Sequence, residues 1–292
     1  MSEKKTGPGS HKKRSLSGRY LFVTITVLVL ISIYAAYKLL DVENDVAPIR
    51  VSVVVEDSGN LRWGAFMAGI EQAASDNNVE ITTVTTSLFD KSSDRDALIR
   101  QEKADGADHV ITSPGEHIYP DPAEQVGHLF NMITEDYGQD LTDRTFIFFG
   151  ADPKDEYDVR RMDYLAERIR DAGGNIKVRI TRPYDASSFL KSSKRSDIVV
   201  ALDDRALSDC AQYMSEKKGR KRKLYGIGNS PDNVYYLDHL VISGMVVTDE
   251  FTRGYENIMY IINASDADVI VSSYPIRPEE IYEKDNQKLL FP

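Results

Sequence analysis

From residue 49 onward, the sequence alternates short apolar runs with longer amphipathic stretches, and this alternation constrains the fold more than any other feature. Such a pattern is typical of βαβ units, in which helices cover parallel strands. Because two sheets can be built from eight strands, we expect an α/β fold with two lobes of parallel sheet flanked by helices. The apolar runs predict strands over residues 49–55, 79–85, 109–112, 145–149, 176–181, 198–202, 223–227 and 241–247.

The stretches between these runs carry helical signals. An apolar stripe at helical spacing runs through Ala65, Met67, Ala68, Ile70, Ala73 and Ala74. Gly173 and Gly174 follow Ala172 and predict a helix end, because glycine adopts the left-handed conformation that closes many helices. The signals together predict helices over residues 61–77, 95–103, 122–137, 157–172, 187–192, 205–217, 233–238 and 251–264.

An apolar run at residues 21–40 precedes the alternating region. Its only charged residue is Lys38, and a helix of this length can cross a hydrocarbon core of about 30 Å. Six Lys or Arg residues before it, against the single acid Glu3, predict a cytoplasmic N-terminus by the positive-inside rule. A cleaved signal peptide is the alternative, although Ala35-Ala36-Tyr37 is a poor cleavage site. We expect a basic cytoplasmic leader at 1–20, a transmembrane signal anchor at 21–40, a stalk at 41–48 and an extracytoplasmic domain at 49–292.

Charge and cysteine content exclude several classes of function. Residues 41–292 hold 29 basic and 45 acidic residues, a net charge of −16, which argues against a nucleic-acid partner because phosphate binding needs clustered cations. The basic cluster at residues 217–223 is interpreted as a solvated loop. Cys210 is the only cysteine, so the sequence predicts no disulfide framework and no cysteine-based metal site. No cofactor is expected.

Candidate ligand-binding residues are those that directly follow strands, because parallel sheets bind ligands at the carboxyl ends of their strands. The first predicted strand is followed by EDSGNLRW, residues 56–63. Trp63 can stack on the apolar face of a sugar ring while Asn60 binds its hydroxyls. An equally good interpretation of this segment is a capped helix whose tryptophan lies in the core.

Several segments together resemble the type I periplasmic binding protein family, the sugar-binding proteins that share their fold with LacI-type repressor domains. VSVVVEDSGNLRWGAFMAGIEQAASDNNVEI resembles the family's opening strand, loop and helix. GADHVITSP is similar to its third strand, and SDIVVALDDRALSDCAQYM resembles its Asp-x-x-Ala-Leu segment. LYGIGNSPDNVYYLD and MVVTDEFTRGYENIMYII resemble its last strands and helices, so the likeness covers nearly all of residues 49–292.

The resemblance implies a set of ligand-binding residues. Asn60 and Trp63 would contact the ligand from the first lobe, with Asp90 as a further contact. Arg161, Asp203 and Asn229 would complete the site from the second lobe. An Arg and several Asp or Asn side chains around an aromatic ring suit vicinal hydroxyls. Two alternatives remain: a surface role for Arg161 in a charged helix, and a helix-capping role for Asp203.

The sequence also departs from the family's pattern. Only about thirty residues separate Thr112 from Thr145, so the first lobe is expected to lack one helix and one strand, with Tyr119–Pro122 as the crossing into the second lobe. The first lobe would then hold about residues 49–118 plus a C-terminal return, and the second about 123–240. Thr248 stands where many relatives have Gln, and His239-Leu240 where many have Gly.

The expected function is a non-enzymatic, membrane-anchored binding protein for a sugar or similar small polar solute. It would deliver the solute to an ABC transporter or signal to a membrane sensor kinase. One alternative is a membrane-anchored glycosyltransferase-like enzyme with Asp203 and Asp204 around a divalent metal, but the sequence has no Gly-rich phosphate loop, HExxH or GxSxG. Another is a degenerate partner-binding module without a ligand.

Overall fold

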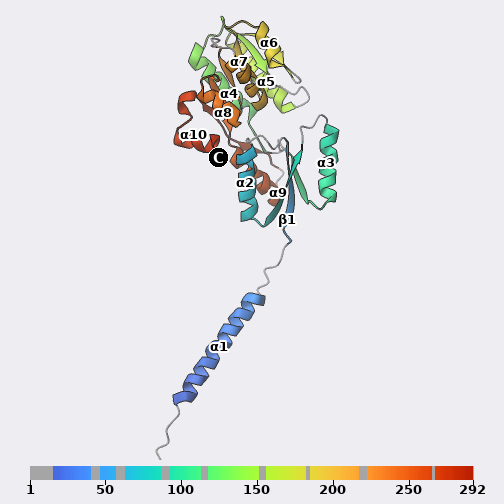
Figure 1. Ribbon diagram of the computed structural model, residues 1–292, viewed down its shortest axis with the longest axis vertical. Coiled ribbons are helices and arrows are strands. Elements are labelled where there is room, and N and C mark those ends of the chain that lie inside the picture. The colour runs from blue at the N-terminus through green and yellow to red at the C-terminus, as the bar shows by residue number, and fades with distance from the viewer. Residues whose placement is uncertain are drawn as a thin grey trace, which may run out of the picture. The chain divides into compact units, whose positions relative to one another are not determined.

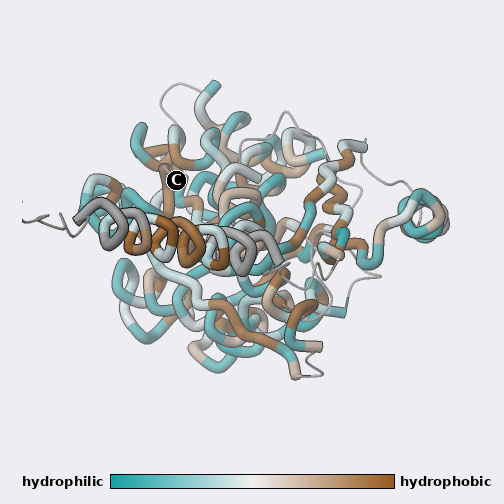
Figure 2. Tube along the Cα trace, turned by 90° about the horizontal axis from the view of Figure 1, so that it is seen from below, coloured by the Kyte–Doolittle hydropathy of each residue, from teal (hydrophilic) through white to brown (hydrophobic). Residues whose placement is uncertain are grey.

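The computed structural model describes residues 16–40, 47–56, 63–86, 92–112, 118–150, 156–181, 185–216, 222–264 and 267–291. The chain divides into two compact units, residues 1–48 and 49–292. The first contains helix α1 (Leu16–Leu40), whose described turns are mostly in the brown of hydrophobic residues in Figure 2. Within the described residues, no helix combines the length and the apolar character that a membrane crossing requires.

The first lobe of the second unit is built around β1 (Ile49–Glu56), which pairs in parallel with β2 (Val79–Thr86) and β3 (His109–Thr112). Helices α2 (Trp63–Asp76) and α9 (Glu250–Ile262) cover one face of this sheet and share a core with Val51, Val53 and Val55. Helix α3 (Ser92–Ala104) lies on the opposite side of β1 (Figure 1). There the Ser52 hydroxyl donates to Glu102 at 2.8 Å.

Two short strands complete the first lobe. β4 (Ile118–Pro120) and β10 (Val269–Val271) pair in parallel, although about 150 residues separate them in sequence. The Tyr119 hydroxyl reinforces the pairing by donating to Asp268 at 3.0 Å. Helix α9 and β10 therefore return to the first lobe after the chain has formed most of the second.

The second lobe contains a six-stranded sheet in the order β11-β9-β8-β7-β5-β6, parallel except for β11. Alternate residues of its strands face two cores: one under α4 and α5, the other under α6, α7, α8 and α10. Burial on both faces explains why these strands are continuous apolar runs. The elements are α4 (Pro122–Tyr137), β5 (Thr145–Phe149), α5 (Glu156–Asp171), β6 (Asn175–Ile180), α6 (Ala186–Ser192), β7 (Ile198–Ala201), α7 (Asp204–Glu216), β8 (Leu224–Ile227), α8 (Pro231–Asp238), β9 (Gly244–Thr248), β11 (Ser273–Ile276), the 3₁₀ turn η1 (Pro278–Glu280) and α10 (Lys284–Leu290).

The α/β prediction is confirmed: all eight predicted strands and all eight predicted helices of residues 49–292 are present, with ends shifted by up to three residues. Helix α5 ends before Gly173, whose φ of +84° is the left-handed conformation expected there. Strands β4, β10 and β11 and helix α10 were not predicted. The second sheet also includes β9 and β11, beyond the range 123–240 assigned to this lobe from the sequence.

The solvated-loop interpretation of residues 217–223 is wrong for Arg222. This side chain is buried, and its guanidinium donates to the carbonyl oxygens of Leu190, Ser193 and Lys194 at 2.9–3.3 Å. Arg222 therefore closes the C-terminal end of α6. Lys223 forms an ion pair with Asp136 at 3.2 Å, and residues 217–221 lie outside the described ranges.

Candidate functional site

The strands of the second sheet place polar residues at one edge. Strands β7, β8 and β9 are parallel neighbours, so their carboxyl ends lie side by side. The residues that follow them are Asp203 after β7, Asn229 after β8 and Asp249 after β9. This is the edge where parallel α/β sheets bind ligands.

The chain passes between the two lobes three times beside this edge. The first crossing, at Asp121, joins β4 to α4; the second, at Asp249, joins β9 to α9; the third, at Ser272, joins β10 to β11. Asp121 and Asp249 cap the helices that follow by accepting hydrogen bonds from Ala123 N and Thr252 N. At both crossings that lead into a helix, a carboxylate therefore caps the first turn of that helix.

Hydrogen bonds connect the three crossings to one another. The amide of Asp249 donates to the carbonyl of Ser272 at 3.2 Å, which joins the second crossing to the third. The amide of Ser273 donates to the carboxylate of Glu124 at 3.1 Å, which joins the third to the first. The three connecting segments therefore form one bonded unit.

Gln125 lies at the centre of this unit and is only 1% exposed. Its Nε2 donates to the Thr248 hydroxyl at 3.1 Å. Its Oε1 accepts from Nη1 of Arg161 at 3.2 Å and lies 3.0 Å from the Tyr157 hydroxyl, which is also 2.8 Å from the Pro120 carbonyl. The Gln125 amide and the Tyr157 hydroxyl together link β4, α4, α5 and β9.

Arg161, predicted to bind ligand, lies in the second turn of α5 and is buried. Its Nη2 is 2.7 Å from Asp158, and its guanidinium lies 5.0 Å from the centre of the Tyr157 ring. Burial raises the pKa of Tyr157 to about 12, so this hydroxyl stays protonated at neutral pH. Within the described part of the chain, the Nε–H of Arg161 is buried and meets no acceptor. The arginine is thus charge-balanced but retains a hydrogen-bond donor.

Trp63 is the first residue of α2 and is 8% exposed. Its ring packs edge-on against Phe66, with centroids 5.8 Å apart, and it belongs to the first lobe's core. The structure thus places this tryptophan where the core interpretation expected it. Asn60 and Asp90, the other candidates of the first lobe, lie outside the described residues.

Asp203 and Asn229 lie at neighbouring strand ends and are linked through Asp204. Asp203 Oδ1 accepts from Ala206 N at 2.7 Å and so caps α7, as the alternative interpretation expected. Asp204 Oδ1 accepts from the amides of Asn229 and Ser230 and from the Asn233 side chain, at 2.9–3.0 Å. Asp204 therefore fixes the loop that presents Asn229.

The residues that the sequence interpretation missed are Gln125 and Asp204. Gln125 stands in a helix among polar residues, a local pattern typical of a solvated face. Its burial follows from contacts with residues more than 30 positions away, which no local pattern shows. Asp204 was considered only as a metal ligand. No three His, Cys, Asp or Glu side chains in the described ranges are grouped as a metal site would need.

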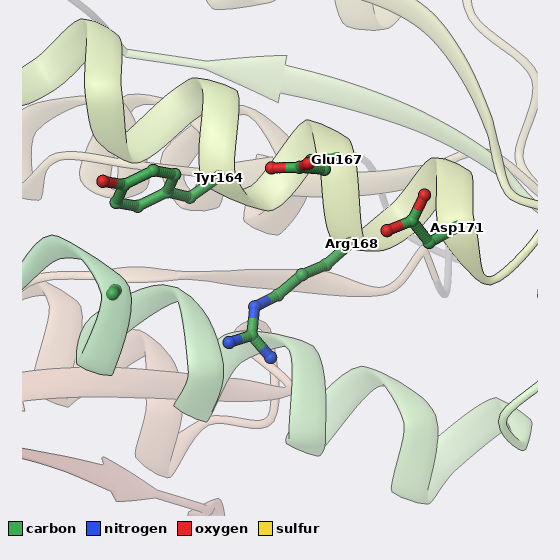
Figure 3. Close-up of a pocket in the computed structure, with 5 residues that line it drawn as sticks. Tyr164, Glu167, Arg168 and Asp171 are labelled. Carbon is green, nitrogen blue, oxygen red and sulfur yellow. The ribbon is translucent and has the colours of Figure 1, made fainter.

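A shallow surface pocket of about 260 Å³ lies between α4 and α5 (Figure 3). Ala123, Tyr164, Glu167, Arg168 and Asp171 line it. It contains none of the predicted ligand residues. Its lining comes from the side chains of two helices and not from the strand ends.

No protein-family model matches the sequence, and no curated protein is significantly similar to it. Solved structures, in contrast, share its fold. A carbohydrate transporter solute-binding protein from Agrobacterium radiobacter in complex with D-arabinose is 14% identical, with a TM-score of 0.70 over 84% of this chain and 99% of that chain. A substrate-binding protein of a sugar ABC transport system from Bordetella parapertussis is 12% identical, with a TM-score of 0.71 over 85% and 94%.

A third similar structure is the XylFII–LytSN complex, at 12% identity and a TM-score of 0.64 over 80% of this chain and 98% of that chain. Such low identities establish the fold alone. The chain has the α/β fold of parallel sheets and flanking helices found in sugar-binding solute-binding proteins, as the sequence resemblance predicted.

Proposed function

We propose that this chain is an extracytoplasmic binding protein for a sugar or a similar small polar solute. The observation that carries the proposal is the arrangement of the three crossings: they connect two parallel sheets beside a strand edge that carries Asp203, Asn229 and Asp249. A ligand held between two lobes joined in this way can alter their relative orientation. The similarity to binding proteins, not enzymes, supports a non-catalytic role.

The charge around Arg161 favours an uncharged ligand. Asp158 lies 2.7 Å from the guanidinium, and both side chains are mostly buried, at 8% and 13% exposure. The positive charge is therefore balanced before any ligand arrives, whereas a carboxylate ligand would bring an uncompensated charge. The remaining Nε–H suits a hydroxyl or ring oxygen. Asn60, Asp90, Asp203 and Asn229 are proposed as further contacts, whereas Trp63 packs in the first lobe's core.

Membrane anchoring is part of the proposal. The run at residues 21–37 has no charged residue and follows a basic leader. Between Phe22 and Tyr34, the described side chains of α1 are mostly apolar and exposed. The hydroxyls of Thr24 and Thr26 donate to carbonyls one turn earlier, so their polarity is satisfied within the helix. An anchor would hold the domain near a transporter or a sensor kinase.

A second candidate is a partner-binding module without a solute. It is favoured by the internal hydrogen bonds of Arg161, Thr248 and Asp203, each of which already has a partner within the chain.

We also propose that the first lobe is shortened. Only five residues separate β3 from β4, too few for a crossover helix.

A ligand panel separates the two candidates. The full chain in mild detergent is melted with neutral monosaccharides, sugar acids and amino acids, with Trp63 fluorescence as the signal. A ligand at about 100 times its Kd adds roughly 2.7 kcal/mol, a rise of a few degrees. We expect a rise with neutral sugars and a smaller one with sugar acids. No shift with any compound would reject the solute-binding proposal in favour of the partner-binding module.

The anchor has a separate test. The full chain should remain in the membrane fraction after carbonate extraction, and protease added to intact spheroplasts should cleave the domain. A variant lacking residues 21–40 should be extracted. Release of the full chain by carbonate would reject the anchor and leave the binding proposal unaffected.

A further inference from the structure

We propose that Gln125 couples the ligand-contacting Arg161 to the crossings between the lobes, so that occupancy of the site changes the hinge. This inference rests on the proposed function, since it gives that site a route by which binding changes the orientation of the lobes. Gln125 itself need not touch the ligand. It acts as a positioning residue.

The first step is the fixed orientation of the Gln125 amide. Oε1 accepts from the Arg161 guanidinium and lies 3.0 Å from the Tyr157 hydroxyl, whose single proton is shared with the Pro120 carbonyl, while Nε2 faces the oxygen of Thr248. A reversed amide would place its NH₂ group against the guanidinium donor, in a site that is 1% exposed. Unpaired buried donors are costly, so only one orientation is stable. The side chain therefore transmits a displacement of Arg161 instead of rotating away from it.

The second step is the position of its partners in the chain. Thr248 is the last residue of β9 and directly precedes the second crossing at Asp249. Glu124, the neighbour of Gln125, accepts from the amide of Ser273 at the third crossing. The first turn of α4 thus contacts the second and third crossings directly and follows the first. A shift of Gln125 acts on the whole hinge.

Without a ligand, Arg161 has partners for two of its three guanidinium nitrogens. Its Nη1 and Nη2 are bonded to Gln125 and Asp158, and its Nε is buried without an acceptor within the described ranges. A ligand oxygen that binds Nε must draw the whole planar guanidinium toward it. Because Nη1 and Nε belong to the same rigid group, this movement also displaces Nη1 and so changes its 3.2 Å bond to Gln125.

The test begins on the ligand-free full chain, by hydrogen exchange at the amides of Asp249 and Ser273. Gln125→Met keeps the side-chain length and removes both hydrogen-bonding ends. We expect exchange at these two amides to rise about tenfold, with no change in β1 or β5. Arg161→Met should give a similar rise alone but no further rise in the Gln125→Met background, because both substitutions break the same route.

Two further variants distinguish a loss of coupling from a general loss of stability. Thr248→Val removes only the acceptor of the Gln125 Nε2 donor and should raise exchange at Asp249 to the same extent. Gln72→Met is the matched control, because Gln72 is exposed on α2 and bonded only locally, to Asp76. It should change neither amide. Additive effects of Arg161→Met and Gln125→Met, or unchanged exchange in Gln125→Met, would overturn the coupling.

The second arm uses ligand, with D-arabinose as the first probe and then the panel sugar that gives the largest thermal shift. We expect Gln125→Met to weaken binding about tenfold and to abolish the ligand-induced decrease in radius of gyration seen by small-angle scattering. Retained closure in this variant would overturn the inference. If no sugar binds the unmodified chain, the solute-binding proposal fails, while the ligand-free exchange cycle still decides whether Gln125 couples Arg161 to the crossings.

Discussion

Gly69 of α2 and Gly254 of α9 each lie against the backbone of the opposite helix. A Cβ on Gly254 would collide with the carbonyl group of Phe66, and a Cβ on Gly69 would collide with that of Phe251. Backbone atoms in two packed helices cannot move aside singly. This contact holds α9, which arrives from the second crossing, against the first lobe.

Gly254→Ala should therefore separate the two helices and lower the free energy of unfolding by about 3 kcal/mol, the upper range for overpacking a core. Urea unfolding followed by Trp63 fluorescence measures the loss. Gly64→Ala is the matched control, because it lies in α2 and a Cβ there meets nothing within 4 Å. It should be neutral or stabilise by up to about 1 kcal/mol, since alanine favours helix. Equal losses in the two variants would contradict the close crossing.

Arg222→Met should destabilise the second lobe. The substitution keeps most of the apolar stem but removes the guanidinium hydrogen bonds to the carbonyls of Leu190, Ser193 and Lys194. The Leu190 carbonyl still accepts from the Ser193 hydroxyl and the Lys194 carbonyl from the Asp197 amide, so the Ser193 carbonyl is the one that loses its donor. We expect a loss of about 2–3 kcal/mol in urea unfolding, because hydrogen bonds from a charged donor are lost and one carbonyl is left unpaired. Arg222→Lys should recover little, because an ammonium cannot reproduce the planar donor geometry. Arg205→Met on the exposed face of α7 should have almost no effect, and a loss equal to that of Arg222→Met would argue against the cap.

The fold was largely predictable because its signals are local. Continuous apolar runs such as Phe146–Phe149 reflect burial on both faces of a parallel sheet, and Gly173 marks the end of α5 within its own turn. The strands β4 and β10 carry no such signal. Each has three residues, β4 ends in a proline, and the two acquire strand geometry only by pairing with each other across the length of the domain.

The candidate site was less predictable for the same reason. The sequence gives Trp63 two equally good interpretations, and only packing against Phe66 places it in the core. Arg161 could be identified by resemblance, but its neutralisation by Asp158 and its bond to Gln125 depend on how α4 and α5 pack. A role that depends on tertiary neighbours has no signature in the local sequence.

Leu240→Gly should stabilise the domain. Leu240 has a φ of +58°, which is unfavourable for a residue with a branched side chain, and it is 77% exposed, so little packing compensates for the strain. Removing the strain should gain up to about 1 kcal/mol after the extra flexibility of glycine in the unfolded chain is subtracted. Thermal melting of Leu240→Gly and Leu240→Ala gives the answer. The alanine variant retains Cβ and should show no gain, so a gain in both would attribute the effect to the lost leucine rather than to φ.

Asp136 joins α4 to the amino-terminal end of β8, through contacts with Lys223 and Tyr225. Burial alone would raise the pKa of this carboxyl, but the Tyr225 hydroxyl, Arg277 at 3.1 Å and Lys223 at 3.2 Å outweigh it and hold the pKa below its usual value. A pKa lower in the folded than in the unfolded chain stabilises the fold above the unfolded value of about 4, and this stabilisation is lost as the pH falls through the folded value.

Asp136→Asn removes this pH-dependent contribution. The free energy of unfolding of the unmodified chain should exceed that of the variant near neutral pH, and the difference should shrink as the pH falls below about 4. Urea unfolding of both proteins across this range measures it. Tyr225→Phe removes one of the groups that lower the pKa, so its stability should depend on pH less steeply than that of the unmodified chain. A difference between the unmodified chain and Asp136→Asn that stays constant with pH would contradict a lowered pKa of Asp136 in the folded chain.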